Sequence, residues 1–223
     1  MTPNDKTPDR KCYGQVCTVT TALDVAGDRW TFLIIRDLLG GPARFEDLVS
    51  GLPGIARNLL SGRLRRLEAD GLVRRVDASV GSVYALTELG AGARPALEEL
   101  GFWGLQLERV APILHARSIR AIAMALQAIL SRAGEALPDQ RVLLELDVDG
   151  EPVEIVLGPD PTATARLSSN PDARIAVPRA TMSELLVGRP FEDEAFEVVS
   201  GDPDLAGVLV GALRAPFAAF AGS

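Results

Sequence analysis

Hydrophobic residues in the first half of the chain recur every three to four positions, which is the period of an amphipathic helix. This spacing predicts helices over residues 18–27, 30–39, 44–51 and 55–70. Two short apolar segments, 72–77 and 82–86, follow as a strand pair with Gly81 near the tip of its turn. A further helix is expected from Thr87 to about residue 109. This succession of helices, followed by a hairpin, is the order of elements in a winged helix-turn-helix domain.

The pattern changes after Pro112. A helix is predicted over 119–130, and alternating apolar and polar residues predict strands over 141–148 and 152–157, joined by the hairpin sequence Asp149-Gly150. Further strands are expected at 163–167, 174–177 and 196–199, with helices at 181–186 and 203–213. Short connections of this kind predict a second domain of the α+β class with a mostly antiparallel sheet. We place the boundary at residues 111–117, between domains of residues 1–111 and 117–223.

The helix over residues 55–70 has two chemically different faces. Ala56, Leu60, Leu64 and Leu67 fall on one side of a helical wheel and should face the core. The opposite side carries Asn58, Ser61, Gly62, Arg65 and partly Arg57, and its guanidinium, amide and hydroxyl groups match base edges in a major groove. Arginines on a helix are most often only a solvated face, so the stripe by itself does not decide for DNA. The helix-turn-helix order around it favours DNA.

Charge is distributed unevenly between the two halves. The net charge of −7 would disfavour a polyanionic partner, but residues 1–115 carry 14 basic and 14 acidic residues, whereas residues 116–223 carry 9 and 16. Within residues 54–75 there are six arginines and two acids. Because local charge governs phosphate contact, the first domain can bind DNA while the acidic second domain lies away from it or influences dimer geometry.

An ordered set of motifs runs through every predicted element of the first domain, namely Cys17, Leu23-Asp24, Gly27-Asp28-Arg29-Trp30-Thr31, Leu33-Ile34-Ile35-Arg36-Asp37-Leu38, Gly41-Pro42-Ala43-Arg44-Phe45, Asp47-Leu48, Leu52-Pro53-Gly54-Ile55, Leu60, Leu64, Leu67, Asp70-Gly71-Leu72-Val73, Arg75, Val83-Tyr84, Leu86-Thr87 and Gly90. Through these motifs the first domain resembles the HxlR family of transcriptional regulators over residues 12–105. The resemblance implies a homodimer whose recognition helices enter successive major grooves of a near-palindromic operator in double-stranded DNA. Repression is the expected outcome.

Further contacts are expected outside the base-reading stripe. The resemblance implies that Arg44 lies close to a phosphate, with a surface salt bridge as its alternative role. Arg63 and Arg66 flank the reading stripe and suit phosphates. The wing, with Ser79 and Ser82, would contact the DNA backbone or the minor groove.

Cys17 corresponds to a cysteine that senses oxidants or electrophiles in part of this family. A helix start lowers a thiol pKa and so favours that chemistry. The alternative is a small buried thiol that packs the first helix. A disulfide with Cys12 is not indicated, because cytosolic thiols usually stay reduced.

The second domain carries its own pattern of apolar and turn residues, namely Pro171-Asp172-Ala173, Ile175, Val177, Leu185-Leu186, Gly188, Val198-Val199-Ser200-Gly201-Asp202-Pro203 and Leu205. Through this pattern it resembles the sterol carrier protein type 2 family over residues 117–220. The resemblance implies helices over a mixed five-stranded sheet and an apolar tunnel for a small-molecule effector. The candidate pocket residues are Ile122, Leu126, Leu185, Leu186, Val208 and Leu209. The alternative is that these residues fill a solid core.

Several classes of protein are disfavoured. One histidine and two cysteines cannot form a four-ligand zinc site, and no nucleophile–base pair or phosphate-cradling glycine loop is present, so we expect neither an enzyme nor a metal or cofactor. No apolar run reaches a membrane span and the N-terminus carries no secretion signal, so we expect a cytoplasmic protein without a membrane partner. The competing function is a carrier of lipids or other hydrophobic molecules whose winged helix mediates protein contacts.

Overall fold

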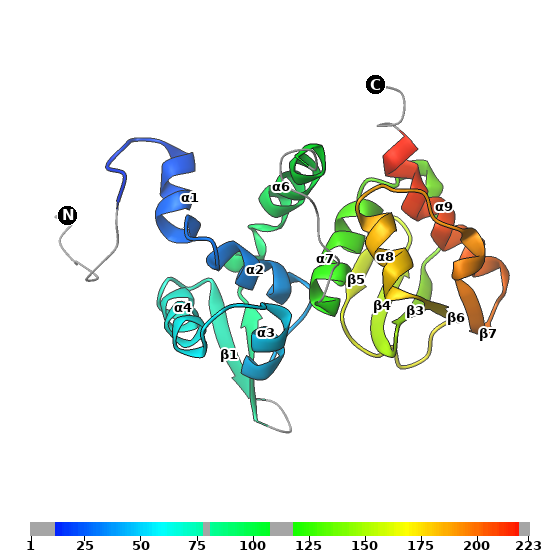
Figure 1. The fold of residues 1–223 in the computed structure, drawn as a ribbon, viewed down its shortest axis with the longest axis horizontal. Coiled ribbons are helices and arrows are strands. Elements are labelled where there is room, and N and C mark those ends of the chain that lie inside the picture. Colours follow the sequence, from blue (N-terminus) through cyan, green and yellow to red (C-terminus); the bar gives the residue numbers. More distant parts are fainter. Residues whose placement is uncertain (1–11, 78–80, 108–117, 219–223) are drawn as a thin grey trace.

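The computed structural model of the chain describes residues 12–77, 81–107 and 118–218 (Figure 1). The predicted domain boundary at residues 111–117 and the wing residue Ser79 lie outside these ranges. Within them the chain is α+β, as predicted, with a helical part followed by a part built on a mixed sheet.

The first part is a winged helix-turn-helix, as the sequence predicts. Its helices are α1 (Thr18–Ala26), α2 (Thr31–Leu39), α3 (Phe45–Gly51) and α4 (Arg57–Ala69). Strands β1 (Val73–Asp77) and β2 (Ser82–Leu86) form the antiparallel wing, in which Asp77 lies opposite Ser82. A single bridge between Ala43 and Tyr84 ties the wing to the segment between α2 and α3. The wing therefore stands in a fixed position beside α3 and α4.

The helix after the wing differs from the prediction. The single helix expected from Thr87 to residue 109 is instead two, α5 (Glu88–Ala91) and α6 (Arg94–Gln106). Pro95 explains the break, because a proline inside a helix removes a hydrogen bond and clashes with the preceding turn. In the first turn of a new helix a proline is tolerated, and Pro95 is the second residue of α6.

The second part is a five-stranded mixed sheet covered by helices. The strands are β3 (Val142–Val148), β4 (Glu151–Leu157), β5 (Thr162–Thr164), β6 (Ala173–Val177) and β7 (Glu197–Gly201), in the order β5-β4-β3-β6-β7. Only the β3–β6 pair is parallel among these neighbours. The helices are α7 (Ile119–Leu130), α8 (Arg179–Leu186) and α9 (Asp204–Ala218), with 3₁₀ turns at Gly134–Ala136 and Asp193–Ala195. The mixed, mostly antiparallel sheet matches the prediction.

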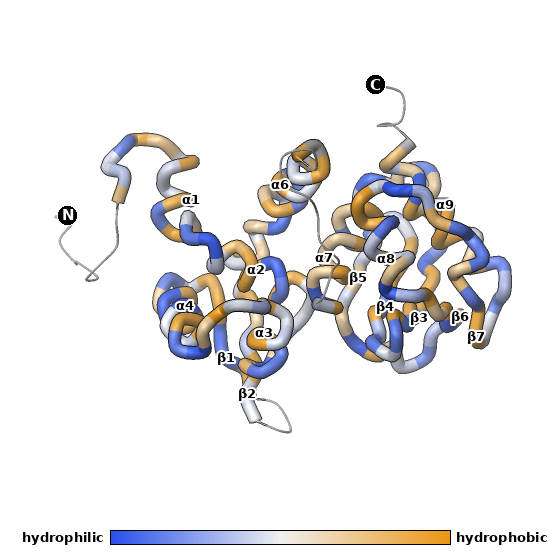
Figure 2. The backbone as a smooth tube through the Cα atoms, viewed as in Figure 1, coloured by the Kyte–Doolittle hydropathy of each residue, from blue (hydrophilic) through white to orange (hydrophobic). Residues whose placement is uncertain are grey.

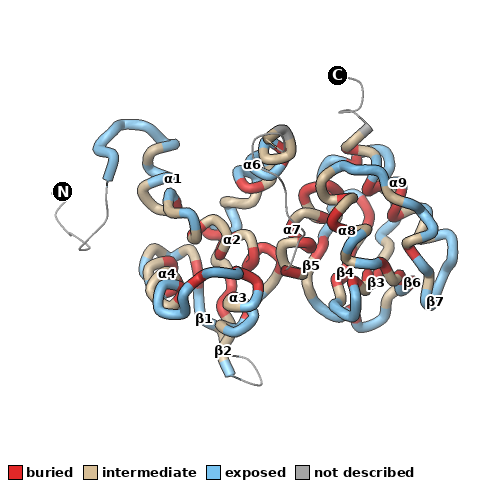
Figure 3. The backbone as a smooth tube through the Cα atoms, viewed as in Figure 1, coloured by how far each residue is buried: buried red, intermediate tan, exposed pale blue. Residues whose placement is uncertain are grey.

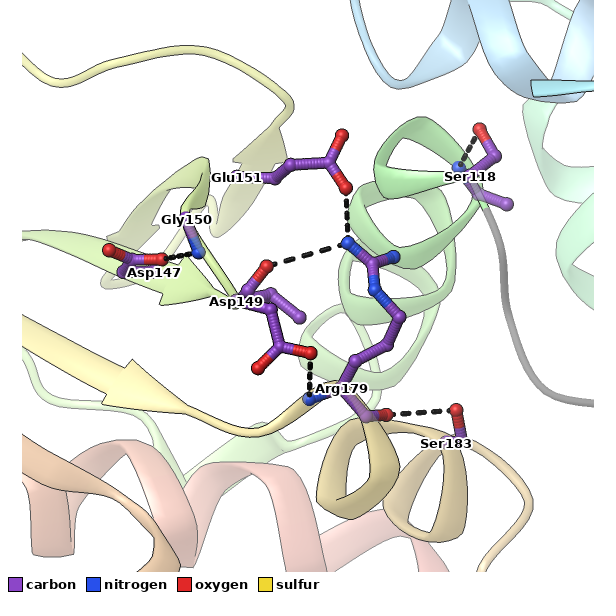
Figure 4. Close-up of polar contacts among 9 residues, drawn as sticks. Ser118, Asp147, Asp149, Gly150, Glu151, Arg179 and Ser183 are labelled. Carbon is purple, nitrogen blue, oxygen red and sulfur yellow. Dashed lines mark hydrogen bonds and ion pairs between the residues drawn. The ribbon is translucent and has the colours of Figure 1, made fainter. Parts of the chain in front are cut away.

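The β3–β4 hairpin also anchors α8. Asp149 and Gly150 have φ values of 52° and 85°, the left-handed backbone that a two-residue turn of this type requires. Arg179, the first residue of α8, donates its backbone N–H to Asp149 Oδ2 at 3.3 Å (Figure 4). Its guanidinium donates to the Val148 carbonyl at 3.4 Å and forms an ion pair with Glu151. The start of α8 is thus fixed to the turn.

The two faces of the sheet differ in polarity. On the helix-covered face, Leu144, Leu146 and Ile155 are fully buried, and apolar and buried segments converge between the sheet and the helices (Figures 2 and 3). The other face carries two buried carboxylates, Glu145 and Glu154, which form ion pairs with arginines outside the core. Among the residues that the structure describes, the apolar core of this part therefore lies on one side of the sheet.

The predicted pocket residues lie in or beside this core. Ile122, Leu126, Leu185 and Leu209 have no exposed surface, and Leu186 and Val208 are partly buried against the same cluster. Their assignment to an effector site stays a prediction.

The two parts meet where α7 packs on α2 (Figure 1). The contact is close: a β-carbon added at Gly40 would lie 2.5 Å from the carbonyl oxygen of Arg120. The Ala165 N–H donates to the Gly40 carbonyl at 2.8 Å, and Met124 of α7 packs into the hydrophobic cluster of the first part. The second part is therefore held directly against the helix that supports the helix-turn-helix.

Candidate nucleic-acid interface

Three leucines fix α4 to the body of the winged helix. Leu60, Leu64 and Leu67 are 0%, 1% and 2% exposed. They lie at intervals of four and three residues, so they form one stripe on the inner face. Because this stripe is completely buried, the orientation of the opposite side of α4 is determined by the core.

The outward side carries the polar residues that the sequence singles out. Asn58 and Arg65 are exposed, and Ser61 and Gly62 are half-buried. Arg65 Nε lies 3.4 Å from the backbone carbonyl of Ser61, one turn earlier. A β-carbon added at Gly62 would meet nothing within 4 Å, so open space lies in front of this position. The amide of Asn58, the hydroxyl of Ser61 and the guanidinium of Arg65 are thus presented together. They lie beside the backbone of Gly62, which another molecule can approach closely.

Arg57 is exposed but engaged. Its guanidinium forms an ion pair with Glu46 of α3, including a hydrogen bond from Nη1 to Oε2 of 2.8 Å. It also lies over the Phe45 ring, 5.2 Å from the centroid. The hydrogen bond from Arg57 lowers the pKa of Glu46, and the same contact raises the pKa of Arg57. A base contact by Arg57 would therefore have to replace this ion pair.

The predicted phosphate contacts surround that stripe. Arg44 is exposed at the start of α3, where its backbone N–H donates to Asp47 Oδ2 at 2.8 Å. Arg63 and Arg66 are half-buried and line an open groove of about 1020 Å³ between α1 and α4. Arg63 Nε lies 3.4 Å from Asp28 Oδ1, which holds one of these two cations close to the start of α2.

The wing is braced from its inner side. Arg75 donates from Nη2 to the Tyr84 hydroxyl at 2.6 Å and lies 5.0 Å from the centre of that ring. Ser82 is half-buried at the start of β2, after Gly81 with a φ of 76°. Ser82 thus lies next to the wing tip, while its predicted companion Ser79 lies outside the described residues.

The two cysteines are exposed, unbridged thiols. Cys17 is the N-cap residue of α1, where hydrogen bonds from the backbone of Thr20 and then Val19 lower the pKa of its thiol. Cys12 instead donates from Sγ to Asp24 Oδ2 at 3.2 Å. The alternative of a buried packing role does not fit Cys17, because its side chain lies at the surface.

Apolar side chains remain exposed on two helices. Val19 and Leu23 of α1 are 63% and 38% exposed, and Leu100 and Trp103 of α6 are 45% and 55% exposed. Leu100 and Trp103 are three residues apart, so they share one face of α6.

Sequence reasoning missed the residues that restrain the site. Glu46 and Arg57 belong to different helices, and no local spacing links them. Asp37 of α2 is fully buried and bonded to Ser118, which lies 81 positions further on. The signal that the sequence offered for this contact was Asp37 itself, a charged residue among the apolar positions of α2.

The described residues contain neither a cluster of metal-ligating side chains nor a helix long and apolar enough to cross a membrane. The arrangement around α4 consists of hydrogen-bond donors, acceptors and cations on a rigid support. It is suited to binding.

A buried leucine stripe under an exposed polar face, next to a two-stranded wing, defines a winged helix-turn-helix protein. Residues 25–111 match the model of the HxlR-like helix-turn-helix family. The chain is 35% identical to the transcriptional regulator YvaP of Bacillus subtilis over 88 residues, which cover 38% of this chain and 82% of YvaP. It is 34% identical to the Bacillus subtilis regulator YodB over 89 residues, which cover 39% of this chain and 80% of YodB. The chain belongs to the HxlR-like helix-turn-helix family.

Among solved structures, the quinone-bound form of YodB from B. subtilis is 32% identical, with a TM-score of 0.36, and the match covers 40% of this chain and 97% of that one.

Proposed function

We propose that the chain is a homodimeric transcriptional repressor that binds a near-palindromic operator in double-stranded DNA through α4. One observation carries this proposal: α4 is locked by buried leucines on one side and presents Asn58 and Arg65 to solvent on the other. Its membership of a family of helix-turn-helix regulators supports the same function.

The proposed contacts divide by chemistry. Asn58 and Arg65 are suited to adenine and guanine edges, because an amide and a guanidinium can each form two parallel hydrogen bonds there. Arg57 joins them once it leaves Glu46. Ser61 and Gly62 lie between them against the base edges. Phosphate contacts are assigned to Arg44, Arg63, Arg66 and the wing residues Ser79 and Ser82.

The dimer is proposed from the exposed apolar surfaces of α1 and α6. Burial of Leu23, Leu100 and Trp103 against a second copy would remove them from water. Two copies of α4 related by a two-fold axis would then read two half-sites, as operator symmetry requires. The molecular mass in solution, measured by light scattering for the wild type and for Trp103→Glu, tests this assembly.

The DNA-binding proposal is tested with an operator selected from genomic fragments by the purified protein. Replacing Arg65 with Ala should weaken binding by about 1–3 kcal/mol and relax preference at one base position. Arg141→Ala is the matched control, because Arg141 is an exposed arginine in the second part, far from α4 in the sequence. Equal loss in both variants, or none in Arg65→Ala, contradicts the assignment.

We further propose that residues 117–223 form a sterol carrier-like effector domain, separate from the DNA-binding domain of residues 1–111. Its one-sided apolar core under helices supports this interpretation. Release of an apolar molecule on denaturation, detected by mass spectrometry, would support it. If an apolar molecule is released in this way but the protein does not retain DNA in a mobility-shift assay, the carrier function is favoured instead.

Cys17 is proposed as an oxidant sensor, on the basis of its exposure and its lowered thiol pKa. Attack of the thiolate on hydrogen peroxide would give a sulfenic acid and release hydroxide, which takes up a proton to become water. DNA binding by Cys17→Ser should then be insensitive to peroxide, while Cys12→Ser should respond as the wild type does. Peroxide sensitivity that persists in Cys17→Ser would exclude the role.

A further inference from the structure

A small apolar hollow lies between the helix that follows the wing and the first helix of the second part. Its volume is about 100 Å³, and its walls come mainly from facing stripes of α6 and α7. Small residues create it: Gly101 of α6 faces Ala125 and Ala128 of α7. Gly101 is exposed, and a β-carbon added there would meet nothing within 4 Å, so the hollow is open on this side.

Most of the lining is hydrocarbon. Phe102 and Ile129 are buried parts of the wall, and Leu186 and Phe217 contribute to it from α8 and α9. Apolar space of this size is enough to hold a single ring. The volume limits the ligand to roughly a benzene ring with a small substituent.

One polar group is exceptional in this wall. Glu98 lines the hollow, and its Oε1 is buried without a hydrogen-bond partner among the described residues. Burial raises the pKa of Glu98, and the cationic side chains of Arg94 and Arg132 partly oppose that effect. A buried acceptor without a donor is costly, so a ligand that donates one hydrogen bond here would relieve that cost.

The neighbouring charges narrow the chemistry of that donor. Arg94 and Arg132 already place positive charge near Glu98, so an ammonium ligand would gain little from the carboxylate. An anionic ligand would meet the carboxylate itself. A neutral hydroxyl can donate a hydrogen bond to Glu98 without bringing a second positive or negative charge to the site.

We propose that this hollow is a binding site for a monocyclic phenol, with the ring between α6 and α7 and the hydroxyl donating to Glu98. The site is distinct from the core pocket considered above, with which it shares only Leu186. It joins a helix of the winged-helix part to three helices of the other part. Any effect of the phenol on operator binding rests on the DNA-binding function proposed above. The binding of the phenol itself does not depend on that function.

Calorimetric titration of the full chain with phenol and with toluene tests the site. We expect the wild type to bind phenol about tenfold more tightly than toluene, because of the hydrogen bond to Glu98. Glu98→Leu should lose this preference, and Glu135→Leu, which removes an exposed carboxylate that does not line the hollow, should keep it. Equal affinities for both ligands in the wild type would overturn the role of Glu98.

A second pair of variants tests the location. Gly101→Leu should fill the hollow and abolish binding of both ligands. Gly104→Leu is its control, because Gly104 is another α6 glycine with open space around it that does not line the hollow. Undiminished phenol binding by Gly101→Leu, or no binding by the wild type at millimolar phenol, would overturn the proposal. Operator affinity measured separately distinguishes this failure from failure of the DNA-binding function.

Discussion

Ser118 donates a hydrogen bond of 3.2 Å from Oγ to Oδ2 of Asp37, and this bond joins α7 of the second part to α2 of the winged helix. Asp37 has no exposed surface, and its other oxygen accepts hydrogen bonds of 3.0 and 2.7 Å from Arg36. Gly51 permits the approach, because a β-carbon there would lie 2.4 Å from Asp37 Oδ2. A buried carboxylate therefore lies at the contact between the winged-helix part and the sheet-containing part.

Replacing Ser118 with Ala should destabilise the protein. The variant leaves Asp37 Oδ2 without this donor and removes the side-chain cap on the Ala121 N–H of α7. The expected loss in free energy of unfolding is about 1–2 kcal/mol, from a buried acceptor and a helix cap together. Urea denaturation measures it. Ser131→Ala at the exposed end of α7 is the control and should stay within about 0.5 kcal/mol of wild type.

The buried carboxylate should also make stability depend on pH. Burial raises the pKa of Asp37 above its ordinary value of 3.8, although Arg36, Ser118 and Arg120 oppose the shift. The folded state then binds a proton more tightly than the unfolded state does, so this group's contribution to stability falls as pH rises from 3.8 through the raised pKa.

The comparison of wild type with Asp37→Asn isolates this contribution, because other carboxylates titrate alike in both proteins. As pH rises across that window, the free energy of unfolding of the wild type should fall relative to that of the variant. A difference between the two that is constant over this range, measured by urea denaturation at several pH values, would contradict the assigned direction.

Features encoded locally were predictable from the sequence. The leucine spacing of α4 identified its buried face because adjacent turns of one helix decide it. The Asp149-Gly150 pair identified the β3–β4 turn because few residues adopt its left-handed backbone. Pro95 also carried a local indication, and the break before α6 was missed because the surrounding helical periodicity outweighed it.

Features that depend on packing between distant segments were not predictable. Asp37 reads as a polar residue that interrupts an apolar helix, and its partner Ser118 is 81 positions away. The hollow at Gly101 exists only because α6 and α7 present small residues to each other. In the same way, the sequence predicts Arg57 on the proposed base-reading face of α4 but does not show that Glu46 already binds it.

Removing the restraint on Arg57 should strengthen operator binding. Glu46→Gln deletes the carboxylate that holds the guanidinium and removes a negative charge beside the proposed DNA surface. We expect operator affinity to rise about threefold, since an exposed ion pair is weak and its release is correspondingly modest. Mobility-shift titration measures this, with Glu135→Gln in the second part as the charge-matched control. Weaker binding by Glu46→Gln would mean that the ion pair positions Arg57 for DNA.

Gly62 offers a test in which stability and DNA affinity should move in opposite directions. It lies within α4 with no atom within 4 Å of an added β-carbon, so Gly62→Ala should fit the free protein without strain. Alanine favours the helix by about 1 kcal/mol relative to glycine, and the free energy of unfolding should rise by roughly that amount. If α4 lies against base edges at this position, the new methyl group would push it from the DNA and operator affinity should fall about tenfold. Ala69→Gly at the exposed end of the same helix is the control, because it should lower stability without changing affinity for the operator. A more stable Gly62→Ala protein that binds the operator as the wild type does would show that this turn of α4 does not face the DNA.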